Sequence, residues 1–129
     1  MTQEDKILLL KDLCARLPYM PKIKITYQQQ GIKGTDEGNV SCDFIEKIVN
    51  DLRNGVITDI QIYLRPMSSM TEEEKKEYDT LIKNMYYGYN GFHDAITVDY
   101  LNSIHVDYRN LLEKGLAIEV TKENNPYKK

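Results

Sequence analysis

The sequence predicts a single α+β domain with an N-terminal helix, a small antiparallel sheet of three or four strands, and a helical C-terminal half packed on one face. Two observations support this fold class. Apolar residues recur at helical spacing near the N-terminus and in the C-terminal half, whereas between residues 22 and 64 they largely alternate with polar ones. The length of 129 residues suits one domain, without linker or internal repeat. We expect this domain over 1–120 and a disordered tail over 121–129.

The first helix has a recognisable start and end. Thr2 can form a capping box with Asp5, three residues further on. Pro18 then stops the helix. The stripe that the rest of the protein is expected to cover comprises Ile7, Leu10, Leu13, Cys14 and Leu17.

The segment that follows predicts strands. Apolar and polar residues alternate over 22–27, which is typical of a half-buried strand. Three glycines within 28–38 predict a turn or mobile loop, and renewed alternation over 40–44 predicts the hairpin partner. A further strand is expected over 56–64, ended by Pro66. Residues 43–55 fit either a short helix, which we favour, or a continuing bent strand.

The C-terminal half begins with a clear helix signal. Thr71 and Glu74 form a second capping box, and apolar residues then recur at helical spacing up to residue 86. The glycines between 87 and 92 break this helix. Two short helices are expected over 97–103 and 107–114, before a last strand over 116–120.

Charge and cysteine content narrow the function classes. The sequence has 17 Lys and Arg residues against 20 Asp and Glu residues, which gives a net charge of −3. A basic surface that binds the phosphate backbone of nucleic acid is therefore disfavoured. Cys14 and Cys42 fall within apolar patterns, which predicts two buried thiols. No apolar stretch approaches the ~20 residues of a membrane span. The acidic N-terminus lacks the basic region of a signal peptide, and we therefore expect a cytoplasmic protein.

Aromatic residues gather in one part of the chain. Six of the twelve lie between residues 86 and 108. Tyrosine combines a large contact area with few rotatable bonds, so it is enriched at protein interfaces. We expect most of these rings to close the core, with a surface that binds another protein as the second interpretation. Because few residues suggest catalysis, the function we favour is a non-enzymatic protein that binds a partner through such a surface. The residues expected to bind a partner protein are Tyr86, Tyr87, Tyr89, Phe92 and Tyr108.

Two further functions remain as alternatives. A helix-turn-helix-like unit over 96–120 would read DNA with Arg109 and Asn110. A hydrolytic or metal site would use imidazole and carboxylate groups, although the spacing favours no particular metal and no cofactor is expected. The side chains available to it are His93, Asp94, Asp99, His105 and Asp107.

Three blocks of the chain carry a resemblance. They are MTQEDKILLLKDLCARLPY at 1–19, YLRPMSSMTEEEKKEY at 63–78 and GFHDAITVDYLNSIHVDYRNLLEKGLAIE at 91–119. In these blocks the chain resembles a group of small uncharacterised proteins of gut-anaerobe genomes, often encoded near phage or mobile-element genes. The resemblance implies a small cytoplasmic accessory protein of phage or mobile-element origin. By analogy with other phage accessory proteins, we expect its partner to be a host or phage protein. The resemblance transfers no catalytic or binding residue. A monomer and a homodimer both fit the pattern.

Overall fold

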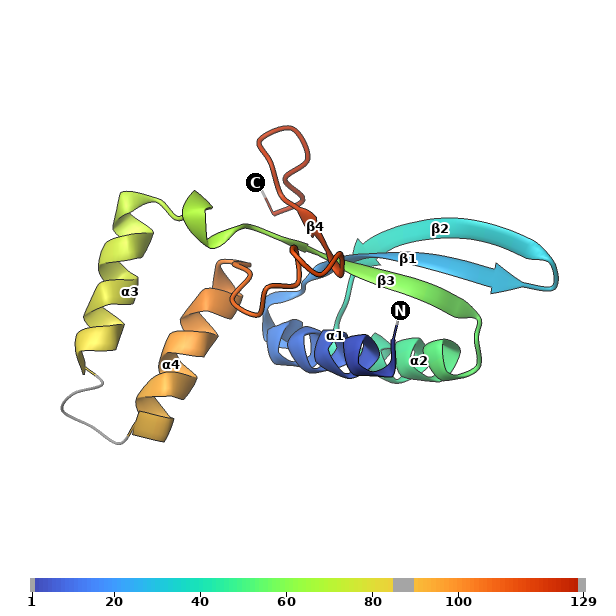
Figure 1. The fold of residues 1–129 in the computed structure, drawn as a ribbon, viewed down its shortest axis with the longest axis horizontal. Helices are drawn as coiled ribbons and strands as arrows, with labels where there is room; N and C mark the ends of the chain where they lie inside the picture. The colour runs from blue at the N-terminus through green and yellow to red at the C-terminus, as the bar shows by residue number, and fades with distance from the viewer. Residues whose placement is uncertain (1, 85–89, 128–129) are drawn as a thin grey trace.

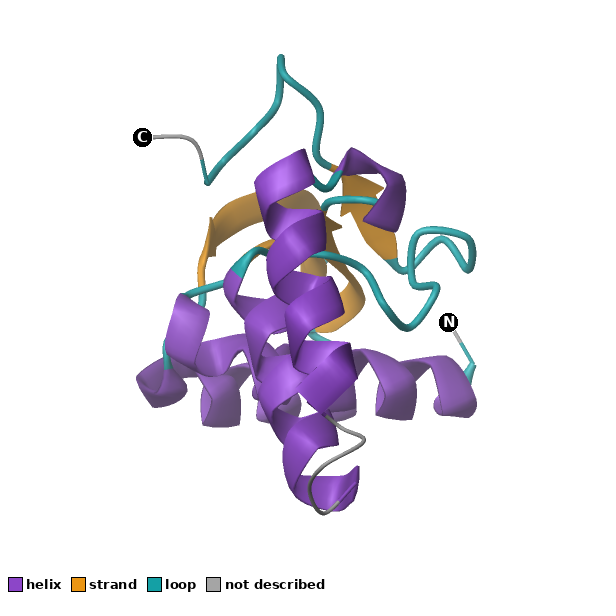
Figure 2. Ribbon diagram, turned by 90° about the vertical axis from the view of Figure 1, so that its left-hand side faces the viewer, coloured by secondary structure: helices purple, strands orange, loops and turns teal. Residues whose placement is uncertain are grey.

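The computed structural model describes residues 2–84 and 90–127, and within this range it describes the side chains outside 84–95. The four strands form one sheet in the order β2-β1-β3-β4. Figure 1 shows α1 and α2 along one face of this sheet, while α3 and α4 form a pair beyond one end of the strands. Figure 2, seen from that end, places this helix pair in front of the strands. The helices are α1 (Gln3–Arg16), α2 (Cys42–Arg53), α3 (Glu72–Asn84) and α4 (Asn90–Ser103), and the strands are β1 (Lys22–Gln29), β2 (Ile32–Asn39), β3 (Ile57–Leu64) and β4 (Ala117–Glu119).

The α+β class is confirmed, and the sheet differs from the prediction in one respect. β1 pairs antiparallel with both β2 and β3, but β4 pairs parallel with β3, so the sheet is mixed. A parallel pair needs a long crossover between its strands. Here α3 and α4 lie within that crossover, and they sit beyond the end of the strands rather than on the face of the sheet.

The β1–β2 hairpin replaces an expected loop. Gln30 and Gly31 form its two-residue turn, with φ of 52° and 80°. Two positive φ values at these positions match the turn that best suits the twist of a hairpin. β2 therefore occupies residues predicted to be a loop, and the predicted hairpin partner over 40–44 is wrong because α2 begins at Cys42. The helix favoured for 43–55 is confirmed.

The main core lies between the sheet and the helices α1 and α2. Its buried members include Leu9, Leu13, Ile23, Leu52, Ile60, Ile62, Leu64 and Leu111. The buried face of α1 overlaps the expected stripe in part. Leu13 is buried and Leu10 and Leu17 pack against the core, but Ile7 is 60% exposed. Leu9, Asp12 and Arg16 are buried in addition. Cys14 and Cys42 are exposed free thiols, so the prediction of buried thiols is wrong.

Both predicted capping boxes are present. Thr2 Oγ1 accepts the N–H of Asp5 at 3.0 Å, and the Asp5 carboxylate accepts the N–H of Thr2 at 3.2 Å. At the start of α3 the Thr71 N–H donates to Glu74 at 2.8 Å, and the Glu74 N–H donates to Thr71 Oγ1 at 3.2 Å. These local contacts fix the N-termini of α1 and α3.

Residues 107–114 form a series of turns, so the helix expected there is wrong. The Asp107 carboxylate accepts the backbone N–H groups of Arg109, Leu111 and Leu112 at 3.0–3.1 Å. Asn110 adopts φ of 60°, which lies outside the right-handed helical region. The acidic side chain thus organises a turn, as Asp often does when it bonds nearby backbone groups.

The segment 121–127, predicted to be disordered, contacts the body of the protein. Tyr127 is its anchor, because its hydroxyl donates to the Tyr63 carbonyl at 2.8 Å and accepts the Lys22 N–H at 2.9 Å. Its ring stacks on His105 with 3.5 Å between the ring centroids. Among the described helices, none combines the length and the apolar character that crossing a lipid bilayer requires.

The link between β3 and α3 depends on an ion pair. Arg65 donates to both carboxylate oxygens of Glu74, at 2.7 and 2.9 Å, and also to the Ser69 carbonyl at 2.9 Å. The hydrogen bond from Arg65 is the largest cause that lowers the pKa of Glu74 to about 2. This carboxylate is therefore ionised throughout the neutral and mildly acidic range.

The pH dependence of unfolding tests this pair. Because the folded-state pKa of Glu74 lies below its ordinary value of 4.5, its contribution is present above that value and is lost as the pH falls toward 2. We expect a loss on the order of 1–2 kcal/mol in the free energy of unfolding, after allowance for solvent screening. Urea unfolding across this range should show a shallower acid slope for Glu74→Gln than for wild type. Equal slopes would contradict the assignment.

Candidate functional site

The predicted aromatic surface lies largely outside the described residues. Tyr86, Tyr87 and Tyr89 belong to that undescribed part, and of Phe92 only the backbone in α4 is described. These four residues stay predictions. Tyr108, the fifth, is placed inside a polar network between α1 and the C-terminal segment, as described below.

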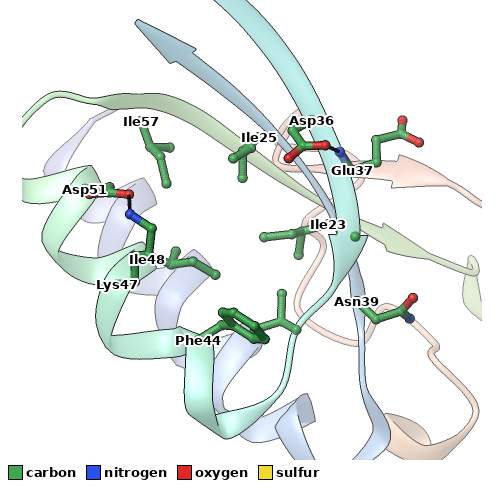
Figure 3. Close-up of a pocket in the computed structure, with 12 residues that line it drawn as sticks. Ile23, Ile25, Asp36, Glu37, Asn39, Phe44, Lys47, Ile48, Asp51 and Ile57 are labelled. Atoms are coloured by element: carbon green, nitrogen blue, oxygen red, sulfur yellow. Dashed lines mark hydrogen bonds and ion pairs between the residues drawn. The ribbon is translucent and has the colours of Figure 1, made fainter. Parts of the chain in front are cut away.

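An open, mostly apolar groove lies between α2 and β2 (Figure 3). Its volume is about 380 Å³, within the range of ordinary ligand pockets. We call it the α2–β2 groove. It is lined by Ile23, Ile25, Asp36, Glu37, Gly38, Asn39, Val40, Phe44, Lys47, Ile48, Asp51 and Ile57.

The groove exists because β2 brings almost no apolar volume to the helix side of the sheet. In the hairpin register Gly34, Asp36 and Gly38 stand opposite Tyr27, Ile25 and Ile23, and paired residues share a face. Nothing lies within 4 Å of the place where a Cβ on Gly38 would be. The isoleucines of β1 are therefore covered by α2 on one side and left open on the side of β2.

An exposed aromatic side chain lies at this opening. Phe44, at the start of α2, lines the groove and is 59% exposed. A large exposed side chain in an apolar groove is typical of surfaces that bind another protein. Ile32, next to the hairpin turn at the other end of β2, is 66% exposed but is not part of the groove lining.

The charges around the groove are mostly acidic. Asp36, Glu37 and Asp51 carry carboxylates, whereas Lys47 is the basic residue of the lining and pairs with Asp51 at 3.1 Å. Figure 3 shows the Asp36 side chain on the groove side of β2 and that of Glu37 on the far side. On the groove side of the sheet the excess negative charge is therefore the carboxylate of Asp36, because Lys47 offsets Asp51.

Glu37 belongs to a small polar cluster on the opposite face of the sheet. It accepts the hydroxyl of Tyr63 at 2.6 Å and lies 3.7 Å from the ammonium of Lys22. The hydrogen bond from Tyr63, followed by nearby lysines, lowers the pKa of Glu37 and keeps it ionised. The same bond raises the pKa of Tyr63 to about 12.

No family model, curated protein or solved structure matches this chain. The groove is therefore interpreted from its own shape and charge.

A buried charged network forms the second notable feature, and its residues carry no local sequence signal. Asp12 and Arg16 of α1 are both fully buried. The Asp12 carboxylate accepts Arg16 Nε at 2.7 Å and Arg109 Nη1 at 2.7 Å. Arg16 also donates to the Val106 carbonyl at 2.7 Å. This network joins α1 to the segment after α4.

Tyr108 completes the network. Its ring lies between the guanidinium groups of Arg16 and Arg109, at 5.1 and 4.6 Å from their central carbons. Its hydroxyl donates to Asn102 at 2.7 Å and accepts from Arg109 at 2.9 Å. The structure thus places Tyr108 in an internal contact, and it places Arg109 there too, whereas Asn110 is exposed. With no helix over 107–114, the DNA-reading element predicted for Arg109 and Asn110 is not formed.

The residues predicted for a metal or hydrolytic site take part in different contacts and do not form one site among the described residues. Asp107 accepts backbone N–H groups, while Asp99 bonds the hydroxyl of Tyr19 and thereby raises the pKa of that tyrosine. Burial, and then the charges of Arg16 and Arg65, lower the pKa of His105 to about 4. The side chains of His93 and Asp94 lie outside the described part. Within that part, no group of three or more His, Cys, Asp or Glu residues is arranged to hold a metal ion.

Proposed function

We propose that this protein is a non-enzymatic binding module that receives a segment of a partner protein in the α2–β2 groove. The observation that carries the proposal is an open apolar groove of about 380 Å³ with the exposed ring of Phe44 in its lining. Apolar pockets surrounded by a few polar groups are the usual anchor sites of bound side chains.

The lining and the charge of the groove indicate which residue types the partner segment carries. An apolar side chain would fill the space above Ile23 and Ile25, and the carboxylate of Asp36 favours a neighbouring Lys or Arg on the partner. A cytoplasmic accessory role in a phage or mobile element, acting on a host or phage protein, is part of this proposal and rests on the resemblance of the three sequence blocks.

A displayed peptide library tests the groove directly. Gly38→Phe should fill it, because the space beside Gly38 is open. Gln28→Phe serves as the matched control, since Gln28 is an exposed position of the same sheet on the opposite face. Peptides selected on the wild-type protein should carry an apolar residue next to Lys or Arg. Their affinity, measured by fluorescence anisotropy, should fall about tenfold or more in Gly38→Phe, a change of about 1.4 kcal/mol, and should be retained in Gln28→Phe.

Two outcomes would reject the proposal. One is the failure of the wild-type protein to enrich any peptide family over the Gly38→Phe variant. The other is enrichment of peptides that bind both proteins equally, since that would place the binding surface elsewhere. Weaker binding at higher salt would support the role of the Asp36 carboxylate, because exposed charge pairs are screened by ions.

A further inference from the structure

β2 presents a free edge along its whole length. Within the described residues it pairs with β1 alone. In a hairpin with a two-residue turn, Gln29 and Ile32 exchange backbone hydrogen bonds, and from there bonded and non-bonded positions alternate. The backbone groups of Lys33, Thr35 and Glu37 therefore point outward. The Glu37 N–H fits this assignment, because it donates to the adjacent Asp36 carboxylate at 2.9 Å rather than to β1.

We infer that a second copy of this chain pairs with this edge, β2 against β2 in antiparallel orientation, and inserts Ile32 into the α2–β2 groove of the first copy. The inference rests on the proposed function, since it uses the same groove, and it names one occupant. The two sheets would then form one continuous sheet across a twofold axis.

The charges of Lys33 and Glu37 favour one register for the pairing of the two β2 strands. With the twofold axis at Thr35, each Lys33 stands opposite Glu37 of the other copy. Both residues are exposed and both project from the face opposite the helices. Opposite charges on directly paired residues stabilise adjacent strands, whereas like charges destabilise them. The same register pairs the outward backbone groups of Thr35 with those of its own counterpart.

The same register also fills the groove. Ile32 of one copy stands opposite Gly38 of the other, and both positions face the helices. Gly38 has open space above it and lines the groove, while Ile32 is 66% exposed. The pairing would thus bury an exposed isoleucine beside Phe44. Lys33, the next residue, projects from the opposite face of the sheet, where it meets Glu37 of the other copy.

The inferred dimer is modest in size. Strand pairing along one edge, with one apolar side chain inserted at each end, corresponds to the small interfaces of transient complexes. We therefore expect a monomer–dimer equilibrium in the micromolar range rather than an obligate dimer. Main-chain bonds supply affinity, and the inserted side chains set the register.

Charge exchange tests the register. Sedimentation velocity over a concentration series should show the wild-type protein dimerising, while Lys33→Glu and Glu37→Lys should each stay monomeric because like charges then face one another. A mixture of the two variants should form a heterodimer, since both facing pairs are again opposite in charge. Lys76→Glu, at an exposed position of α3, provides the control and should dimerise normally. Absence of the heterodimer would overturn the inference.

Ile32→Ala tests the insertion. We expect it to weaken the dimer about tenfold or more, whereas Ile7→Ala, at an equally exposed isoleucine of α1, should leave it unchanged. A wild-type protein that is monomeric throughout the series, or a dimer insensitive to Lys33, Glu37 and Ile32, would overturn the inference. If library peptides still bind wild type but not Gly38→Phe in that case, the proposed function stands and only the named occupant is wrong.

Discussion

Replacement of Asp12 by alanine is expected to destabilise the protein by about 3–5 kcal/mol, the usual cost of removing one partner from a buried ion pair. Asp12 is the acceptor for two arginines, one on its own helix and one in the C-terminal segment. Without it, the fully buried guanidinium of Arg16 keeps its charge but loses its counter-ion. The loss should lower both the urea midpoint and the melting temperature.

Two variants calibrate this expectation. Asp79→Ala removes an exposed carboxylate of α3 and should change the free energy of unfolding by no more than about 0.5 kcal/mol. The double variant Asp12→Leu with Arg16→Met replaces the buried pair by apolar groups. It should be more stable than Asp12→Ala, because no charge is then left buried on α1. Equal stability of Asp12→Ala and wild type would show that the network does not form.

Replacement of Tyr127 by alanine is expected to cost about 2–3 kcal/mol, because it removes buried ring area together with two hydrogen bonds. The Tyr127 hydroxyl links the N–H of Lys22 in β1 to the carbonyl of Tyr63 in β3. Burial raises the pKa of Tyr127 to about 12, so the hydroxyl keeps its proton at neutral pH. The segment 121–127 thereby links the adjacent strands β1 and β3 through hydrogen bonds.

A second substitution distinguishes the contribution of the Tyr127 ring to stability from that of its hydroxyl. Tyr127→Phe keeps the stacking on His105 and should cost only about 1 kcal/mol. Lys122→Ala, at an exposed position of the same segment, should have no measurable effect on urea unfolding. If Tyr127→Ala unfolds at the wild-type urea concentration, the segment 121–127 is not held by this side chain.

Local signals made the helix starts predictable. Thr2 and Asp5, and likewise Thr71 and Glu74, lie three residues apart and bond one another directly, so their geometry is encoded within a single turn. The strand over 57–64 was also predictable, because Ile60, Ile62 and Leu64 alternate along the sequence and all three are buried in the core.

β2 escaped prediction because its two faces do not differ in polarity. The segment Ile32–Asn39 is exposed at nearly every position, so no alternation marks it as a strand. Its conformation comes from pairing with β1, and Gly34 is covered by the ring of Tyr27 across the hairpin. Of the three glycines that suggested a loop, Gly38 leaves space that forms part of the α2–β2 groove.

The buried network escaped prediction for a different reason. Asp12 and Arg16 look like the solvated face of an amphipathic helix, since charged side chains are rarely buried. Their burial depends on Arg109 and Tyr108, and Arg109 follows Asp12 by 97 positions. A contact over such a distance leaves no trace in the local periodicity that sequence reasoning uses.

The parallel pairing of β4 with β3 has a consequence for the order of assembly. β1 and β2 are joined by a two-residue turn and β3 follows after α2, whereas β4 can pair only after the longer segment with α3 and α4 has folded back. Closing such a long stretch of chain costs more configurational entropy than closing a hairpin. We therefore expect the three antiparallel strands to form first and the C-terminal strand to join the sheet last.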